Sequence, residues 1–218
     1  ANGDAFGTGL ALSANGNTVA IGAPFNSSIG LWRGQVKIFT NNSGTWTQVG
    51  TNINGEANED QSGFALSLSG DGTVLSIGAS SNNGTGSFSG HVRVYKNISG
   101  IWTQLGTDIN GEATNDASGF AVSLSSDANY VAVGAQRNDG NGTDSGHVRV
   151  YNLTTLLSNQ NFNSNFAFKL YPNPVINVFN IDIDNEIKDI EMYTIQGRRV
   201  HNAKPNRVDV SGVSSAIY

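Results

Sequence analysis

The chain has 218 residues, with 27 Gly, no Cys, 13 % charged residues and a formal net charge of −5 at pH 7. This acidic balance offers no basic field to a phosphate backbone and excludes nucleic acid as a partner, while the lack of Cys excludes disulfides and thiolate metal sites. No apolar run approaches the roughly 20 residues of a membrane-spanning helix, so we expect no membrane span.

Three landmarks recur along the chain at intervals of 56 residues. They are the glycine of an IGA or VGA triplet (Gly22, Gly78, Gly134), a valine (Val36, Val92, Val148) and, in two copies, a tryptophan (Trp46, Trp102). A register that persists through loops as well as apolar runs indicates one supersecondary unit copied in tandem. We place the copies at residues 4–59, 60–115 and 116–155.

The second copy predicts four short strands. Residues 64–69 alternate apolar and polar side chains, and a GDG turn signal joins them to a hairpin partner at 73–79. After a loop rich in Gly and Ser, residues 91–97 and 101–106 supply two more strands. Because one such sheet cannot bury both faces, its copies must stack. The prediction is an all-β fold, a partial β-propeller of about three four-stranded blades.

The third copy departs from the pattern after Tyr151 and has no counterpart of the strand at 101–106. So few blades do not close a ring. We therefore expect either a fragment of a longer protein, which is the interpretation that we favour, or a subunit that completes itself by assembly.

The pattern DxxGFAxSLSxDG…GHVRVY…WTQLG, over residues 4–151, resembles the FG-GAP repeats of integrin-type β-propellers. The resemblance implies a propeller fold. It also raises the question of calcium, because the family's repeats carry a DxDxDG-like loop that surrounds the ion with oxygen ligands. Here each matching turn offers at most one carboxylate, Asp71 or Asp127. The family's calcium ligands are therefore mostly absent.

A different loop, residues 138–146, gathers Asp139, Asn141 and Asp144 among glycines. These oxygen donors suit one hard cation, so calcium is the one cofactor that the sequence suggests. The simpler interpretation is a solvated loop.

Residues that recur in each copy are assigned to the fold, because an active site needs unlike groups at one point. His91 and His147 occupy the position of Gln35, and Glu56 and Glu112 share a GEA motif. GxSxG, HExxH and P-loop motifs are absent from the sequence. We therefore expect a protein that is not an enzyme.

Side chains that differ between copies are the better candidates for ligand contact. The long loop before the third strand carries aromatic and Arg residues, which suit stacking on sugars or anchoring a protein partner. The alternative is that they cover a neighbouring blade. The candidates are Phe25, Trp32, Arg33, Phe88 and Arg137.

After the repeats, a polar linker at 156–167 leads to a second β segment at 168–218. Residues 179–184 alternate as a strand, residues 190–195 form another, and the QG dipeptide that follows is a hairpin signal. We expect a small Ig-like β-sandwich.

Three elements of this segment resemble the type A C-terminal sorting domain of the type IX (Por) secretion system of Bacteroidota. They are LYPNP at 170–174, IEMYTIQGRRV at 190–200 and DVSGVSSAIY at 209–218, in the family's order. The resemblance implies passage through the periplasm to the cell surface or the medium, with the type IX machinery as partner. It assigns the sorting signal to Tyr171, Pro172, Asn173, Pro174, Gly197 and Arg198. Because the family continues beyond the position of Tyr218, we expect this domain to be truncated.

The resulting expectation is a secreted or surface-displayed β-propeller that binds glycans or surface proteins for adhesion, without catalysis. Two alternatives stay open. One is a structural surface protein that self-assembles into homo-oligomers through unpaired strand edges. The other is the non-catalytic part of a polysaccharide-active enzyme.

Overall fold

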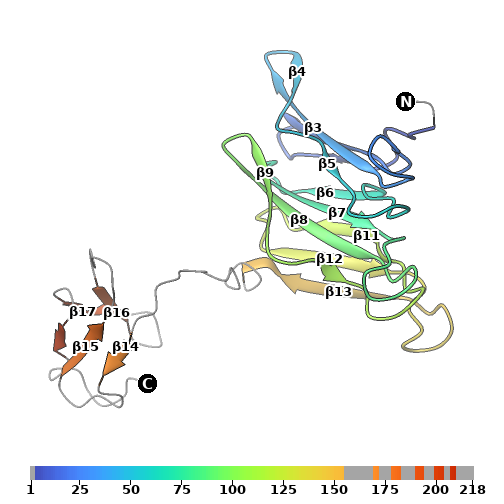
Figure 1. Ribbon diagram of the computed structural model, residues 1–218. Coiled ribbons are helices and arrows are strands. Elements are labelled where there is room, and N and C mark those ends of the chain that lie inside the picture. The colour runs from blue at the N-terminus through green and yellow to red at the C-terminus, as the bar shows by residue number, and fades with distance from the viewer. Residues whose placement is uncertain are drawn as a thin grey trace. The chain divides into compact units, whose positions relative to one another are not determined.

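The computed structural model describes residues 3–154 and, nearer the C-terminus, the backbone of strands at 169–171, 178–182, 190–193, 199–203 and 207–209. The chain divides into two compact units, residues 1–160 and 161–218. The sheets of both units are antiparallel (Figure 1). The predicted all-β class is confirmed.

The N-terminal unit contains three sheets, one for each repeat. The first sheet consists of β1 (Leu10–Leu12), β2 (Thr18–Ala23), β3 (Gln35–Asn42), β4 (Thr45–Gln48) and β5 (Ile53–Asn54). The second consists of β6 (Ala65–Leu68), β7 (Val74–Ala79), β8 (His91–Ile98), β9 (Ile101–Gln104) and β10 (Ile109–Asn110). The third consists of β11 (Ser118–Leu124), β12 (Tyr130–Ala135) and β13 (His147–Asn152). The described residues of this sheet form three strands, and the prediction that it lacks a fourth falls on positions after 154, outside the described residues.

The predicted fourth strand at 101–106 corresponds to β9, and the sheet also contains a short strand, β10, that the sequence did not predict. Both β9 and β10 pair with β8, the first with its end and the second with its start. Between them Gly106 has φ 67°, outside the extended region, and Gly50 has φ 73° at the same point of the first sheet. The positive φ interrupts the ladder and lets the chain turn along β8.

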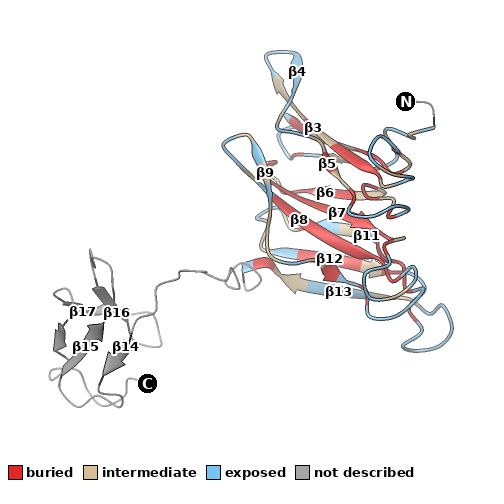
Figure 2. Ribbon diagram, viewed as in Figure 1, coloured by how far each residue is buried: buried red, intermediate tan, exposed pale blue. Residues whose placement is uncertain are grey.

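The three sheets pack face to face, and their facing side chains form two cores. The first core joins sheets 1 and 2 through Ala20, Val36, Ile38, Ile53, Leu66, Leu68, Leu75, Ile77 and Tyr95. The second joins sheets 2 and 3 through Val74, Val92, Val94, Ile109, Leu124, Val131, Val133 and Leu153. Sheet 2 is thus covered on both faces, which explains why all six residues of β7 are buried (Figure 2).

Pairs of glycines bring neighbouring sheets into backbone contact. A Cβ on Gly22 would overlap the carbonyl oxygen of Gly63, and a Cβ on Gly78 would overlap that of Gly119. Gly63 and Gly119 themselves have φ values of 90° and 82°, a region that glycine adopts without a steric penalty. The recurring glycines of the IGA and GFA elements therefore meet across each interface between sheets.

The C-terminal unit contains a three-stranded sheet and a two-stranded sheet. The first has the order β14 (Lys169–Tyr171), β15 (Val178–Asp182), β18 (Arg207–Asp209), and the second pairs β16 (Ile190–Tyr193) with β17 (Arg199–Ala203). The predicted strands at 179–184 and 190–195 correspond to β15 and β16. The QG hairpin signal lies between β16 and β17, which pair antiparallel.

Candidate functional site

The long loop between the second and third strands of each sheet keeps one backbone conformation while its side chains change. In each copy a side-chain oxygen accepts the backbone N–H five residues later: Ser27 from Trp32 at 3.0 Å, Asn83 from Phe88 at 2.8 Å, and Asp139 from Asp144 at 2.7 Å. The N–H donors have φ values of 45°, 52° and 51°, a region that costs a non-glycine residue about 1 kcal/mol or more. The fold therefore presents three different side chains from one constrained position.

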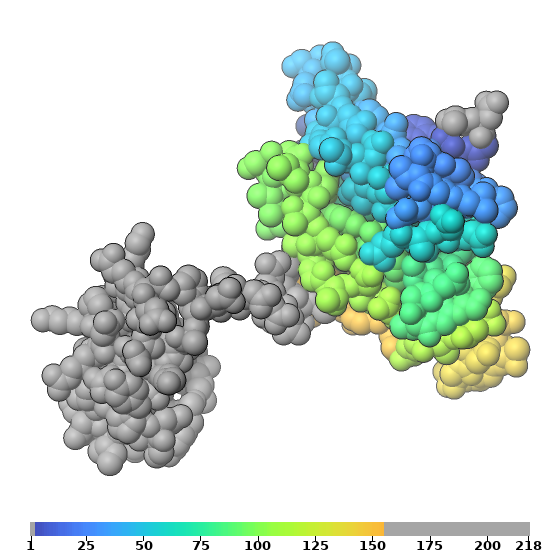
Figure 3. Space-filling model, viewed as in Figure 1, coloured from blue at the N-terminus to red at the C-terminus, as the bar shows by residue number. Residues whose placement is uncertain are grey.

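A buried asparagine anchors each of these loops to an aspartate at the start of its repeat. The side-chain amide donates to the carboxylate in the pairs Asn26–Asp4 at 2.8 Å, Asn82–Asp60 at 3.0 Å and Asn138–Asp116 at 2.9 Å. The three loops lie in sequence order along one edge of the stack (Figure 3). This edge is a rigid and repeated scaffold.

The predicted aromatic contact residues lie on this edge and are partly open to solvent. The rings of Phe25 and Trp32 meet edge to face with centroids 6.1 Å apart. Trp32 and Phe88, at the same position of successive loops, are each 47 % exposed, and Ile29 and Leu31 beside Trp32 are each 49 % exposed. The first loop thus carries an apolar patch, defined here as Phe25, Ile29, Leu31 and Trp32.

The two arginines predicted to contact a ligand, Arg33 and Arg137, have different environments. Arg33 is bound to backbone, because its Nε donates to the Gly55 carbonyl at 3.0 Å and its Nη2 donates to that of Glu56. These bonds fix the segment that follows β5 and leads to sheet 2. Arg137 is exposed in the third loop, so its guanidinium is the one more accessible to a ligand.

Asp139, Asn141 and Asp144, the candidate calcium ligands, are all exposed. Asp139 takes the acceptor role that neutral Ser27 and Asn83 take in the other copies, so the loop conformation does not require a carboxylate there. Asn141 and Asp144 lie in the same loop, with the N–H of Asp144 bound to Asp139. The calcium interpretation stays a prediction.

The two acids in the turns that match the family's calcium loop hold those turns. Asp71 Oδ1 accepts the Ser69 hydroxyl at 2.6 Å and the Thr73 N–H at 3.0 Å. Asp127 makes the corresponding bonds to the Ser125 hydroxyl and the Asn129 N–H. The hydroxyl bonds, followed by the backbone bonds, hold the pKa of both carboxyls below the usual value.

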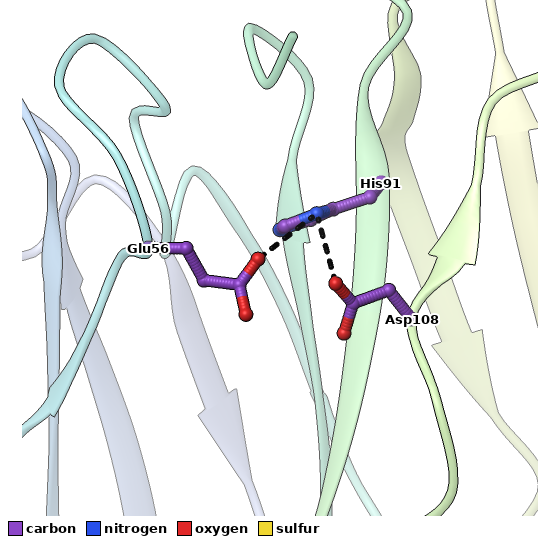
Figure 4. A group of neighbouring side chains, drawn as sticks. All are labelled: Glu56, His91 and Asp108. Atoms are coloured by element: carbon purple, nitrogen blue, oxygen red, sulfur yellow. Dashed lines mark ion pairs between the residues drawn. The ribbon is translucent and has the colours of Figure 1, made fainter. Parts of the chain in front are cut away.

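A group of titratable side chains, Glu56, His91 and Asp108, gathers where the first two repeats meet (Figure 4). Glu56 lies in the connection after β5, His91 begins β8 and Asp108 precedes β10. His91 is 1 % exposed, and its Nδ1 lies 3.9 Å from Glu56 Oε2 and 3.8 Å from Asp108 Oδ2. We call these three residues the histidine cluster.

Burial and the neighbouring Arg93 favour the neutral form of the His91 imidazole. Burial lowers the pKa of His91, and the Arg93 guanidinium lowers it further, against the opposing effect of Asp108 and Asp60. Burial likewise raises the pKa of Glu56, although Arg93, with Nη1 3.7 Å from Glu56 Oε1, opposes this shift. The His91 Nε2 is buried without a hydrogen-bond partner.

The ligand atoms of the histidine cluster lie within 4.8 Å of one another, close enough to hold one divalent cation. Two observations favour a structural role instead. Arg93 already neutralises Glu56, and the contact recurs between Glu112, His147 and Arg149 at the next interface. The sequence assigned Glu56 and His91 to the fold but missed Asp108, whose only signal is that Asn52 occupies its position in the first copy.

Replacing His91 with Gln should flatten the pH dependence of stability. Because the pKa of His91 is lowered in the folded state, the unfolded chain binds more protons below pH 6.5, and stability should fall as the pH drops from there towards the folded pKa. Gln occupies this position in the first repeat, where Gln35 donates to Asn54 at 2.9 Å. Urea unfolding between pH 5 and 8 measures the slope.

The matched control for this experiment is His147→Gln, at the same position of the third sheet. At concentrations where the chain is monomeric, the His147 side chain is 22 % exposed against 1 % for His91, so its replacement should change the slope less. Equal slopes for wild type and His91→Gln would show that His91 does not carry the pH dependence.

Little of the sorting signal falls within the described residues. Tyr171 ends β14. Pro172, Asn173, Pro174, Gly197, Arg198 and the linker at 156–167 lie outside the described residues. No helix long and apolar enough to cross a membrane occurs in the described part of the chain.

Comparison with known structures gives distant similarities. The hydrazine synthase of Kuenenia stuttgartiensis is 10 % identical with a TM-score of 0.43, over 87 % of this chain and 41 % of its own. The periplasmic gluconolactonase of Pseudomonas aeruginosa is 13 % identical with a TM-score of 0.48, over 90 % of this chain and 56 % of its own. The chain thus spans between about two fifths and just over half of these structures. No curated protein matches the sequence.

Two family models match the sequence at separate places. Residues 110–151 match the FG-GAP repeat. Residues 169–218 match the secretion system C-terminal sorting domain, known as the Por secretion tail. This domain implies an interaction with the type IX secretion machinery. The chain therefore carries an FG-GAP repeat followed by a type IX sorting domain, which indicates export to the cell surface or the medium.

Proposed function

We propose that this protein is a non-catalytic recognition protein of the cell surface or medium, which binds a protein ligand for adhesion through the loop edge of its repeats. The observation that carries the proposal is the shared position of Trp32, Phe88 and Asp144. One constrained backbone presents a different side chain in each copy. A constant scaffold with variable exposed side chains is typical of binding surfaces.

A protein ligand fits the first loop better than a sugar. Its apolar patch combines Trp32 with Ile29 and Leu31, each about half exposed. Aromatic residues surrounded by aliphatic ones form the anchors of protein interfaces. Sugar recognition needs polar groups around the stacked ring, and here Arg33 is bound to backbone carbonyls.

The architecture behind this proposal is a β-propeller. The sheets of successive repeats stack face to face, each with the strand order of a propeller blade. The three sheets would be three blades, and the two small sheets of the C-terminal unit would form a β-sandwich. Catalysis is not part of the proposal, because the contact of Glu56 with His91 and Arg93 recurs as that of Glu112 with His147 and Arg149 at the next interface, which favours a structural role.

Trp32→Ala should weaken ligand binding by at least tenfold, the effect of losing an aromatic anchor of about 1.4 kcal/mol or more. Binding of the labelled full chain to intact cells of the source bacterium measures the effect. The control is Ile101→Ala, an exposed apolar residue on the hairpin at the opposite end of sheet 2. Unchanged binding by Trp32→Ala would contradict the proposal. Protease treatment of the cells should abolish binding, whereas binding that survives it would indicate a glycan.

A further inference from the structure

Sheet 3 exposes a face that its two sister sheets bury. Residues at one position of the third strand are 0 % exposed in sheets 1 and 2 and 70 % exposed in sheet 3: Val36, Val92 and Val148. Two residues later the values are 0 %, 3 % and 65 %, for Ile38, Val94 and Val150. Figure 2 shows the change from the red β8 to the pale β13. Sequence and backbone are repeated, so the face has the shape to receive another sheet of the same kind.

A hollow of about 460 Å³ opens on this face, with Gly134, His147 and Val148 in its lining. Their counterparts in sheet 1 are Gly22, Gln35 and Val36. All three lie close to Gly63, with the Gly22 Cα 3.2 Å, the Gln35 carbonyl oxygen 3.3 Å and the Val36 Cγ2 2.8 Å from the position of a Cβ on that glycine.

The same arrangement recurs at sheet 2. Gly119 lies against Gly78, the His91 carbonyl and the Val92 side chain. The hollow at Gly134 therefore has the lining that receives the glycine of a GFA element at both interfaces within the chain. The group that fits this hollow is therefore a glycine with positive φ just before the first strand of a sheet, as Gly63 and Gly119 are.

The opposite end of the stack presents such an element. Gly7, the counterpart of Gly63, has φ 102° and donates its N–H to the Gly22 carbonyl at 2.8 Å, as Gly63 does to Gly78 at 3.1 Å. The leucines that follow it, Leu10 and Leu12, are 63 % and 61 % exposed. Their counterparts Leu66 and Leu68 are 9 % and 8 % exposed in the first core. Both halves of the sheet interface are thus present in one chain, and residues 3–154 leave both of them uncovered.

We propose that two copies of this chain associate head to tail, with sheet 1 of each copy on sheet 3 of the other and Gly7 in the hollow at Gly134. This contact between copies repeats the two interfaces within the chain, between sheets 1 and 2 and between sheets 2 and 3. Such a heterologous contact closes a ring when its rotation matches the number of subunits. Two copies supply six sheets, within the 4–8 blades of known propellers.

One substitution within the repeat fits this arrangement. Phe6 stands where Ser62 and Ser118 are buried at the internal interfaces. There Gly55 and Gly111, next to β5 and β10, lie so close that a Cβ on them would come within 3.2 Å and 3.0 Å of those serines. Sheet 3 has no counterpart of β5 among the described residues. Within residues 3–154, the place that Gly55 and Gly111 take at the internal interfaces is thus unfilled at sheet 3, where Phe6 would lie.

The mass of the full 218-residue chain in solution tests the proposal, by light scattering or sedimentation over a range of concentrations. Wild type should have twice the chain mass of 22.9 kDa. Gly134→Ala should be monomeric, because its methyl group enters the hollow. It leaves the fold intact, since the nearest atom to the new Cβ is the Ala121 Cβ at 3.5 Å.

Val148→Lys should also be monomeric, because it places a charge on the face. Its matched control is Ile101→Lys, a strand residue of similar exposure, 67 % against 70 %, on neither open face; it should stay dimeric. Thermal unfolding checks that each variant is folded. A monomeric wild type at all concentrations overturns the proposal, as does a dimer that survives both Gly134→Ala and Val148→Lys.

Discussion

Gly78→Ala is expected to destabilise the repeat unit by about 3 kcal/mol, at the upper end of the usual range for overpacking a core. The new Cβ would overlap the carbonyl oxygen of Gly119, which belongs to the adjoining sheet. That oxygen is backbone and cannot rotate away, so the variant must separate sheets 2 and 3. The second core, which includes the fully buried Val92 and Val131, would be opened with them.

The same substitution at Gly134 is the matched control, because the two residues share strand, position and neighbours in the repeat. At Gly134 no other sheet of residues 3–154 covers the glycine, and a Cβ would be in ordinary contact at 3.5 Å. We expect its free energy of unfolding to lie within about 0.5 kcal/mol of wild type. Urea unfolding followed by Trp fluorescence, at concentrations where each protein is monomeric, measures the difference. Equal midpoints for the two variants would show that the glycine pair does not set the spacing of the sheets.

The repeat interval predicted the strands well because each strand has its own alternating pattern. What the interval could not predict is which residues meet across sheets. Glu56 belongs to the first repeat by sequence but contacts His91 and Arg93 of the second, because the connection after β5 crosses to the next sheet.

The direction of a loop side chain is the other feature that residue type does not predict. Trp32 and Arg33 are adjacent and were both candidates for ligand contact. The structure leaves Trp32 nearly half exposed and turns Arg33 onto backbone carbonyls. The difference follows from the positive φ at Trp32 and from the position of the Gly55 and Glu56 carbonyls, which accept hydrogen bonds from Arg33. Neither is visible in a single sequence.

Asp60→Ala should cost about 3 kcal/mol of stability, because it removes the acceptor for one buried and two partly buried hydrogen bonds. The carboxylate is 0 % exposed. Its Oδ2 accepts the N–H groups of Glu56 at 2.9 Å and Ala57 at 2.8 Å, and its Oδ1 accepts the Asn82 amide at 3.0 Å. Alanine would leave all three donors unsatisfied. Asp60→Asn should lose less, since it keeps one acceptor oxygen.

The matched control is Asp71→Ala, which removes an aspartate that holds a turn at the surface and should cost about 1 kcal/mol. Chemical denaturation of Asp60→Ala, Asp60→Asn and Asp71→Ala measures the loss of unfolding free energy in each variant. An Asp60→Ala variant as stable as Asp71→Ala would show that water satisfies the exposed donors. Because the Asp60 carboxylate raises the pKa of His91 against the effect of burial, its loss should lower that pKa further and steepen the pH dependence that His91 carries. The Asp60 carboxylate thus bonds both to Asn82, which anchors the second loop, and to the backbone of Glu56, which lies between sheets 1 and 2. A substitution in the loop should therefore alter the stability of the interface between these sheets, and the reverse.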